Sequence, residues 1–277
     1  MSEMDIAQLQ HWVGRVEERH EQIAPAHAAR LAALFDVPVP LEGEALPFLW
    51  HWAYFTPDAP QAQIGHDGHP RLGGFLPPIP LPRRMWAGGR LTFHVPLQVG
   101  ETAQRKSEII SVTEKNGRQG RLVFVTLRHL LSGAAGLAIE EEQDIVYREP
   151  AITRQPAPSE VMMQADWRDE FMPDTVTLFR YSALTFNAHR IHYDLPYAMN
   201  EENYPGLVVH GPLTATRLLA AYELHTSRKP TTFSFRGQAP LFAGAPVQLC
   251  GRLSATGHEL WAEGPGGYLA MQASVSV

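Results

Sequence analysis

The order of predicted secondary structure elements is the same in the two halves of the chain. Residues 23–36 are rich in Ala and Leu at helical spacing, and alternating apolar runs typical of strands follow from Arg90 to Glu149. A second helical run begins near Gly211, and strand-like runs return from Thr231 to the C-terminus. A helix followed by several antiparallel strands, found twice, predicts an α+β fold built from two related units.

A short motif within the strand regions also supports a duplication. Phe93 precedes Pro96-Leu97-Gln98-Val99-Gly100, and Phe235 precedes Pro240-Leu241-Phe242-Ala243-Gly244. In each place Pro-Leu-x-x-Gly would close one strand and turn into the next, although such turns are common in β proteins. Together with the matching order of elements, the motif predicts a double hot-dog fold, in which each of two antiparallel sheets wraps around a central helix.

The predicted boundary between the two units lies in a Pro-rich, polar stretch. Residues 150–168 are typical of a linker, so we expect an N-terminal domain of residues 1–150 and a C-terminal domain of residues 151–277. Residues 56–89 contain many Pro and Gly, and so long an irregular segment in a compact domain is usually a binding loop or lid. We expect the N-terminal domain to be non-catalytic and to shape a substrate pocket with this loop.

The composition restricts the class of protein. Hydrophobic residues make up 44% and charged residues 19%, which is typical of a globular chain, and the net charge of −6 argues against a nucleic-acid partner. The single cysteine, Cys250, excludes an internal disulfide and fits a reducing compartment. The first residues do not resemble a signal peptide, and no run of eighteen apolar residues predicts a membrane span. We therefore expect a cytoplasmic protein with no membrane partner.

A cluster of polar side chains stands out between the predicted helices. Asn187, His189, His192 and Asp194 fall within eight residues, and Val209-His210-Gly211-Pro212 follows at the start of a helical run. Histidine suits proton transfer near neutral pH, and the free N–H groups of a helix start can hold a developing negative charge. The two segments together indicate a site that moves a proton and stabilises an oxyanion.

The residues of these segments resemble a known family. LTFNAHRIHYDLPYA, residues 184–198, resembles the hydratase motif of MaoC-like, R-specific enoyl-thioester hydratases. GLVVHGPLTATRLL, residues 206–219, resembles the Val-His-Gly start of that family's central helix. The spelling Asn-x-His-x-x-His-x-Asp and the stretch GGFLPPIPLPRRMWAGGRLTFHVPLQVGE resemble the type-two hydroxyacyl-thioester dehydratase branch, with the mesaconyl-C4-CoA and itaconyl-CoA hydratases. The resemblance covers nearly the whole chain.

The resemblance implies roles for individual residues. The family's catalytic His falls on His192, which we assign as general acid/base. The family's catalytic Asp falls on Asn187 and the family's Asn on His189. Since an amide cannot exchange a proton as a carboxylate does, we assign Asn187 to positioning the water, and His189 either assists or holds the loop. Gly211, preceded by His210, would form the oxyanion hole.

Other charged residues have weaker assignments. Arg83, Arg84 and Arg190 are candidates to bind a substrate carboxylate or the phosphates of CoA. Asp194 precedes a short predicted helix and is expected to cap its N-terminus. His189, His192 and Asp194 have a spacing that could suit a metal, but no further cluster completes a ligand shell, so we expect no metal.

The resemblance implies a hydro-lyase that adds water reversibly to an enoyl-CoA thioester, in particular a short branched or dicarboxylic one. A 3-hydroxyacyl-thioester dehydratase of fatty-acid or polyketide metabolism is the alternative within this class. A hot-dog thioesterase or a non-catalytic acyl-CoA binder remains open as well. No cofactor is expected beyond the CoA carried by the substrate, and a homodimer is left open.

Overall fold

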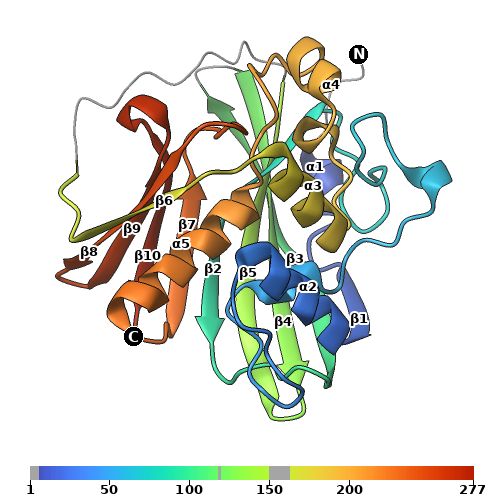
Figure 1. Ribbon diagram of the computed structural model, residues 1–277. Helices are drawn as coiled ribbons and strands as arrows, with labels where there is room; N and C mark the ends of the chain where they lie inside the picture. Colours follow the sequence, from blue (N-terminus) through green and yellow to red (C-terminus); the bar gives the residue numbers. More distant parts are fainter. Residues whose placement is uncertain (1–5, 118–119, 150–162) are drawn as a thin grey trace.

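Ten strands form one continuous antiparallel sheet in the computed structural model, which describes residues 6–117, 120–149 and 163–277 (Figure 1). The order across the sheet is β1-β3-β4-β5-β2-β7-β10-β9-β8-β6. The strands of the N-terminal half are β1 (Val16–Gln22), β2 (Arg83–Phe93), β3 (Thr102–Gly117), β4 (Gly120–Gly133) and β5 (Gly136–Arg148). Those of the C-terminal half are β6 (Trp167–Phe171), β7 (Thr232–Gly237), β8 (Val247–Ser254), β9 (Gly257–Glu263) and β10 (Leu269–Ser276).

The two halves of the sheet have the same topology. Outward from the centre, the N-terminal half runs β2-β5-β4-β3-β1 and the C-terminal half runs β7-β10-β9-β8-β6, so each begins with its second strand and ends with its first. The halves join where β2 pairs with β7, from Gly88 opposite Arg236 to Thr92 opposite Thr232. This repetition confirms the predicted duplication. The expected boundary at residues 150 and 151 lies outside the described residues.

The Pro-Leu-x-x-Gly motifs occupy equivalent places in the two halves. The N–H of Leu46 donates to the carbonyl of Leu97 at 2.7 Å, and the N–H of Val209 donates to the carbonyl of Leu241 at 2.8 Å. Each motif ends at a glycine with positive φ, +96° at Gly100 and +81° at Gly244, a backbone conformation that favours glycine. Leu46 therefore corresponds to Val209, and the residues that follow Leu46 correspond to those that follow Val209.

This correspondence corrects the expected helix pairing. The helix α5 (Gly211–Thr226) begins two residues after Val209 and packs on β8, β9 and β10, whereas only the single 3-10 turn η1 (Trp50–Ala53) follows Leu46. The helix α2 (Pro25–Phe35), predicted as the central helix of the N-terminal half, instead packs against α3 (Thr175–Leu184), and each of these two helices follows the first strand of its half. Leu49 and Phe55, on either side of η1, have positive φ values of +66° and +54°, which interrupts helical geometry.

An irregular segment covers the sheet where the N-terminal half lacks a long helix. Between η1 and β2 the structure has only the short turn η2 (Gln61–Gln63) and an isolated bridge, which confirms that this stretch is irregular, although β2 begins at Arg83 within the predicted loop. The side chains that pack over this part of the sheet share an apolar character: Leu72, Phe75, Leu76, Ile79 and Leu81. Beneath them lie buried residues of three strands: Ile109, Val112, Val123, Val125 and Tyr147.

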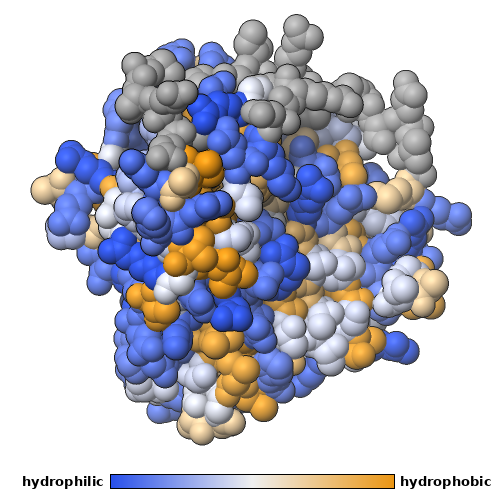
Figure 2. Space-filling model, turned by 180° about the vertical axis from the view of Figure 1, so that it is seen from behind, coloured by the Kyte–Doolittle hydropathy of each residue, from blue (hydrophilic) through white to orange (hydrophobic). Residues whose placement is uncertain are grey.

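The remaining helices are short. They are α1 (Ile6–Gln10) and α4 (Leu195–Asn200), and two further 3-10 turns are η3 (Arg190–His192) and η4 (Pro265–Gly267). None of the helices in the part of the chain that the structure describes is long and apolar enough to cross a membrane. Seen from behind, the surface is mostly hydrophilic, and its hydrophobic residues gather in patches near the middle of this face (Figure 2).

Candidate active site

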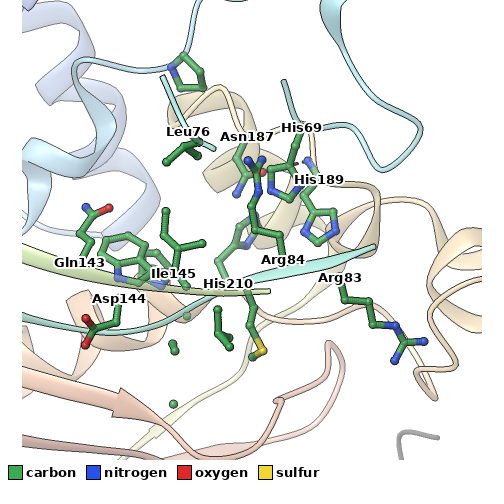
Figure 3. Close-up of a pocket in the computed structure, with 18 of the residues that line it drawn as sticks. His69, Leu76, Arg83, Arg84, Gln143, Asp144, Ile145, Asn187, His189 and His210 are labelled. Carbon is green, nitrogen blue, oxygen red and sulfur yellow. Dashed lines mark hydrogen bonds between the residues drawn. The ribbon is translucent and has the colours of Figure 1, made fainter. Parts of the chain in front are cut away.

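A groove of about 2500 Å³ runs between the two halves. The irregular segment of the N-terminal half and the first residues of β2 line one part of it, and the polar cluster and the start of α5 line another. Figure 3 shows Arg84 pointing among His69, Asn187 and His189, whereas Arg83 points away from these histidines. The two polar segments of the C-terminal half thus face residues of the N-terminal half across one cavity.

Four histidine rings form a row along this groove. The ring centroids of His69 and His189 lie 4.1 Å apart, those of His189 and His192 lie 5.5 Å apart, and those of His192 and His210 lie 3.6 Å apart. Burial, and then the charge of Arg84, lower the pKa of His69. Burial, and then the neighbouring rings of His69 and His192, lower the pKa of His189. Burial likewise lowers the pKa of His192 to about 4. These three rings are therefore mainly neutral at neutral pH.

His192 is held with one ring nitrogen free. It ends the turn η3, and its Nδ1 donates to the carbonyl oxygen of Val208 at 2.8 Å. Since a carbonyl only accepts, Nδ1 carries the proton, and Nε2 keeps its lone pair. A neutral imidazole that lines the groove, and whose Nε2 has no hydrogen-bond partner among the described residues, has the geometry that a general base needs.

The start of α5 lies at the other end of the row. His210 is the N-cap residue of α5, its Nε2 lies 2.8 Å from the hydroxyl of Ser182, and burial lowers its pKa well below the usual value. Pro212 lacks an N–H, and a Cβ added at Gly211 would meet no atom within 4 Å, so the backbone of Gly211 faces open space. The N–H of Gly211 donates to no backbone acceptor among the described residues, which leaves it free to bind an oxyanion.

Asn187 and His189 belong to the turn that precedes η3. The side-chain oxygen of Asn187 accepts from the backbone N–H of His189 at 3.0 Å, which fixes the amide. The amide nitrogen still has two hydrogens to donate, so Asn187 can hold a water but cannot take its proton. The structure thus brings Asn187, His189, His192, His210 and Gly211 to one groove, as the sequence predicts.

The three candidate arginines differ in their partners. Arg83 is buried, and its Nε lies 2.9 Å from a carboxylate oxygen of Glu202. Nη2 of Arg190 lies 2.7 Å from a carboxylate oxygen of Asp194. Asp194 also accepts from the N–H of Tyr197 at 3.1 Å, which confirms it as the N-cap of α4. Among the described residues, Arg84 alone of the three has no carboxylate partner, and its charge reaches the groove.

The sequence did not single out two residues of the site, Asp67 and His69. Both lie in the irregular segment between η1 and β2. The carboxylate of Asp67 lies 2.8 Å from Nδ1 of His69. Burial would raise the pKa of Asp67, but the hydrogen bond and charge of His69, with Arg84 nearby, hold it well below its usual value. The signal that could have found them is an Asp-x-His spacing between glycines within a segment already expected to bind a substrate.

These residues also form a group that could hold a metal ion. The ligand atoms of Asp67, His69 and His189 all lie within 4.8 Å of one another. The set suggested by sequence spacing, His189, His192 and Asp194, is not assembled, because Asp194 caps α4 and pairs with Arg190. The positive charge of Arg84 beside Asp67 and His69 opposes the binding of a divalent cation there.

Comparisons with known proteins show what the chain is similar to. The model of the family described as hydroxyacyl-thioester dehydratase type 2 matches residues 49–243. The chain is 50% identical to the mesaconyl-C(4)-CoA hydratase of Chloroflexus aurantiacus over 278 residues, 99% of each protein. A solved MaoC-like dehydratase of Phytophthora capsici superposes with a TM-score of 0.68 at 14% identity, covering 99% of each chain. A double hot-dog protein of Mycobacterium tuberculosis superposes with a TM-score of 0.57 at 13% identity, covering 98% of this chain and 97% of its own.

The two structural similarities confirm the double hot-dog fold, and the sequence similarities extend to the segments that form the groove. The family model spans η1, the irregular segment, the histidine row and the start of α5. From these matches, the chain belongs to the hydroxyacyl-thioester dehydratase type 2 family, and it is a MaoC-like hydro-lyase that removes water from a hydroxyacyl thioester or adds water to the double bond of the corresponding enoyl thioester.

Proposed function

We propose that this enzyme hydrates a short dicarboxylic enoyl-CoA, with mesaconyl-C4-CoA as the best candidate. The observation that carries the proposal is the 50% identity, over 99% of both chains, with a mesaconyl-C(4)-CoA hydratase. No cofactor is needed, because CoA enters as part of the substrate.

A guanidinium in the groove that forms no ion pair with a carboxylate of the described residues supports a dicarboxylic substrate. Mesaconyl-C4-CoA carries a carboxylate on the β-carbon, next to the bond that takes up water. Burying this charge without a partner would cost several kcal/mol. Arg84 projects among the histidines, and the other two candidate arginines already hold Glu202 and Asp194. We therefore assign the substrate carboxylate to Arg84.

The remaining groups fit the steps of hydration. The thioester oxygen is placed at the N–H of Gly211, where the start of α5 stabilises the enolate. His192 takes a proton from the water through Nε2 as the oxygen bonds to the β-carbon, and the amide of Asn187 orients that water.

A panel of enoyl-CoAs, read by mass spectrometry, tests the proposal. We expect a gain of one water with mesaconyl-C4-CoA, and slower hydration of crotonyl-CoA. Release of free CoA would indicate a thioesterase, and saturable binding without a mass change would indicate a binder. If crotonyl-CoA is the better substrate of the wild type, the dicarboxylic assignment is wrong.

The variant Arg84→Met sharpens this test. A charged hydrogen bond contributes about 1.5–3 kcal/mol, so we expect kcat/KM for the diacid to fall roughly ten- to a hundred-fold, with less than a threefold change for crotonyl-CoA. Arg90→Met is the matched control, since Arg90 lies on the same strand, lines the same groove and is already paired with Glu142 and Asp144. Equal losses on both substrates in Arg84→Met would remove Arg84 from carboxylate recognition.

A further inference from the structure

We propose that the N-terminal half supplies the second proton-transfer group of the reaction, the Asp67–His69 pair, with His69 acting at the α-carbon and Asp67 positioning it. The proposal rests on the hydratase chemistry of the family, and it does not depend on the dicarboxylic substrate. It gives a catalytic role to a half that the sequence analysis expects to be non-catalytic.

The pair lies on a short hairpin of residues 63–71, which the bridge between Ile64 and Pro70 closes and which is docked onto the polar cluster of the other half. The N–H of Arg190 donates to the carbonyl of Asp67 at 2.9 Å, and the guanidinium of Arg190 donates to the carbonyl of His66 at 3.2 Å. Gly68 has a φ of +91°, and a Cβ there would collide with the carbonyl oxygen of Ala188. So close an approach fixes the position of His69 relative to His189 and His192.

The hydrogen bonds within the hairpin set the orientation and tautomer of His69. One carboxylate oxygen of Asp67 accepts from the backbone N–H of His69 at 3.0 Å, and the other accepts from its Nδ1 at 2.8 Å. Because the ionised carboxylate only accepts, Nδ1 carries a proton, and Nε2 is the atom left to exchange one. His69 lines the groove, so Nε2 is the group through which this hairpin can act on a substrate.

The chemistry calls for a second proton-transfer group, and the C-terminal half offers no better one. Hydration moves protons at two atoms, the water oxygen and the α-carbon, and the amide of Asn187 can serve neither. Of the four rings in the row, His69 is the one with a carboxylate partner within the described residues. His192 hydrogen bonds a neutral carbonyl, and His210 a hydroxyl. A carboxylate partner stabilises the imidazolium form, so His69 is the ring of the four that most favourably holds an extra proton.

His192 Nε2 takes a proton from water as the water oxygen bonds to the β-carbon, and the π electrons move onto the thioester oxygen at Gly211. The protonated form of His69, a minor form at neutral pH, then delivers the proton on Nε2 to the α-carbon, and the thioester carbonyl re-forms. The proton on His192 returns to His69 through solvent in the groove. In the reverse direction, neutral His69 removes the α-proton and protonated His192 assists departure of the hydroxyl group.

Elimination from two matched thioesters tests this division of roles. One is the 3-hydroxyacyl-CoA that the wild type dehydrates, whether 3-hydroxybutyryl-CoA or the hydrated diacid, and the other is its 3-chloro analogue. Chloride leaves without a proton, so its loss needs only the α-base. We expect His69→Gln to slow both eliminations a hundred-fold or more in kcat, with KM within threefold of the wild type. His192→Gln should lose water elimination to the same extent but keep chloride elimination within tenfold.

Two further variants complete the test. His66→Gln is the control, because its exposed ring packs against Tyr197 and not in the row, and both rates should match the wild type. Asp67→Asn should slow chloride elimination about tenfold or more, as expected of a positioning residue. The proposal is overturned if His69→Gln keeps either elimination near the wild-type rate, or if His192→Gln loses chloride elimination as fully as His69→Gln does.

Discussion

The two halves of this enzyme share a strand order but differ in what covers it. In the C-terminal half a helix of sixteen residues, α5, crosses the sheet, and its first residue faces the groove. In the N-terminal half the equivalent position holds four residues, η1, and an irregular segment fills the remaining space. The C-terminal half thus has a helix start that can bind an oxyanion. The N-terminal half has only η1 at the equivalent position, and its irregular segment lines the substrate groove instead.

Two buried polar groups, one in each half, also differ in how they are satisfied. In the N-terminal half the buried carboxylate of Glu141 accepts from His51, Trp52 and Gln143, at 3.1, 2.9 and 2.8 Å. Burial would raise the pKa of Glu141, but the hydrogen bond and charge of His51 lower it to about 2. In the C-terminal half, by contrast, Nδ1 of His210 is buried and has no hydrogen-bond partner within the part of the chain that the structure describes. Groups locked by hydrogen bonds stabilise a fold, and groups left free can act on a ligand.

The largest effect is expected when the halves are separated. A protein of residues 151–277 would lose β2, expose the edge of β7 that pairs with it, and lack Arg84 and His69. We expect it to be poorly soluble and without measurable hydratase activity, as judged by gel filtration and turnover. A soluble, fully active fragment would show that the N-terminal half is dispensable.

Matched substitutions in the two halves should separate catalysis from stability. His192→Ala is expected to lower kcat by about 10²–10⁴-fold, because it removes a general acid/base. Glu141→Gln is expected to lower the free energy of unfolding by about 1–3 kcal/mol, because it disturbs a satisfied buried network, while kcat changes less than threefold. Kinetics and denaturant unfolding of both variants check the contrast, and near-normal kcat in His192→Ala would remove His192 from catalysis.

Two glycines at the groove offer a smaller contrast. Gly68→Ala places a Cβ against the backbone of Ala188 at a positive φ, so the hairpin must shift, and we expect at least a tenfold loss of kcat/KM. A Cβ at Gly211 meets nothing within 4 Å, so Gly211→Ala should fold normally and lose activity only by intruding on the thioester oxygen. Steady-state kinetics with melting curves distinguishes the two cases. A stable, fully active Gly68→Ala variant would show that the hairpin contact is unimportant.

The smallest effect concerns acid stability. Burial lowers the pKa of His192 from 6.5 to about 4 in the folded protein. The unfolded chain therefore binds this proton first, and the stabilisation present above pH 6.5 is lost as the pH falls through the folded pKa. Each such histidine contributes up to about 1.4 kcal/mol per pH unit to that slope. Denaturant unfolding between these pH values should give a shallower slope for His192→Gln, and an unchanged slope would contradict a neutral, buried His192.

Sequence reasoning succeeded where patterns are local. The four long strands of each half, the cap at Asp194 and the grouping of His192 with Gly211 follow from alternation, helix-start residues and motif spacing. It missed the edge strands β1 and β6, whose sequences VEERHEQ and WRDEF are rich in charged residues. Charged residues are typical of sheet edges, where they oppose further pairing, and they conceal the apolar alternation that identifies a strand.

The other features that the sequence did not predict depend on contacts between segments that lie far apart in the chain. The counterpart of α5 could be found only through hydrogen bonds that align Leu46 with Val209. The approach of Asp67 and His69 to the histidine row depends on Gly68 meeting Ala188, 120 residues further along the chain. No periodicity or spacing within one segment carries that information.

A crystal structure with a saturated, unreactive thioester such as butyryl-CoA tests the central claim most directly, that both halves build one site around the substrate. The account predicts the thioester oxygen within hydrogen-bond distance of the Gly211 N–H, about 3 Å, with the α- and β-carbons between His192 and His69. A thioester oxygen bound away from the start of α5, or an acyl chain that contacts residues of the C-terminal half alone, would contradict it.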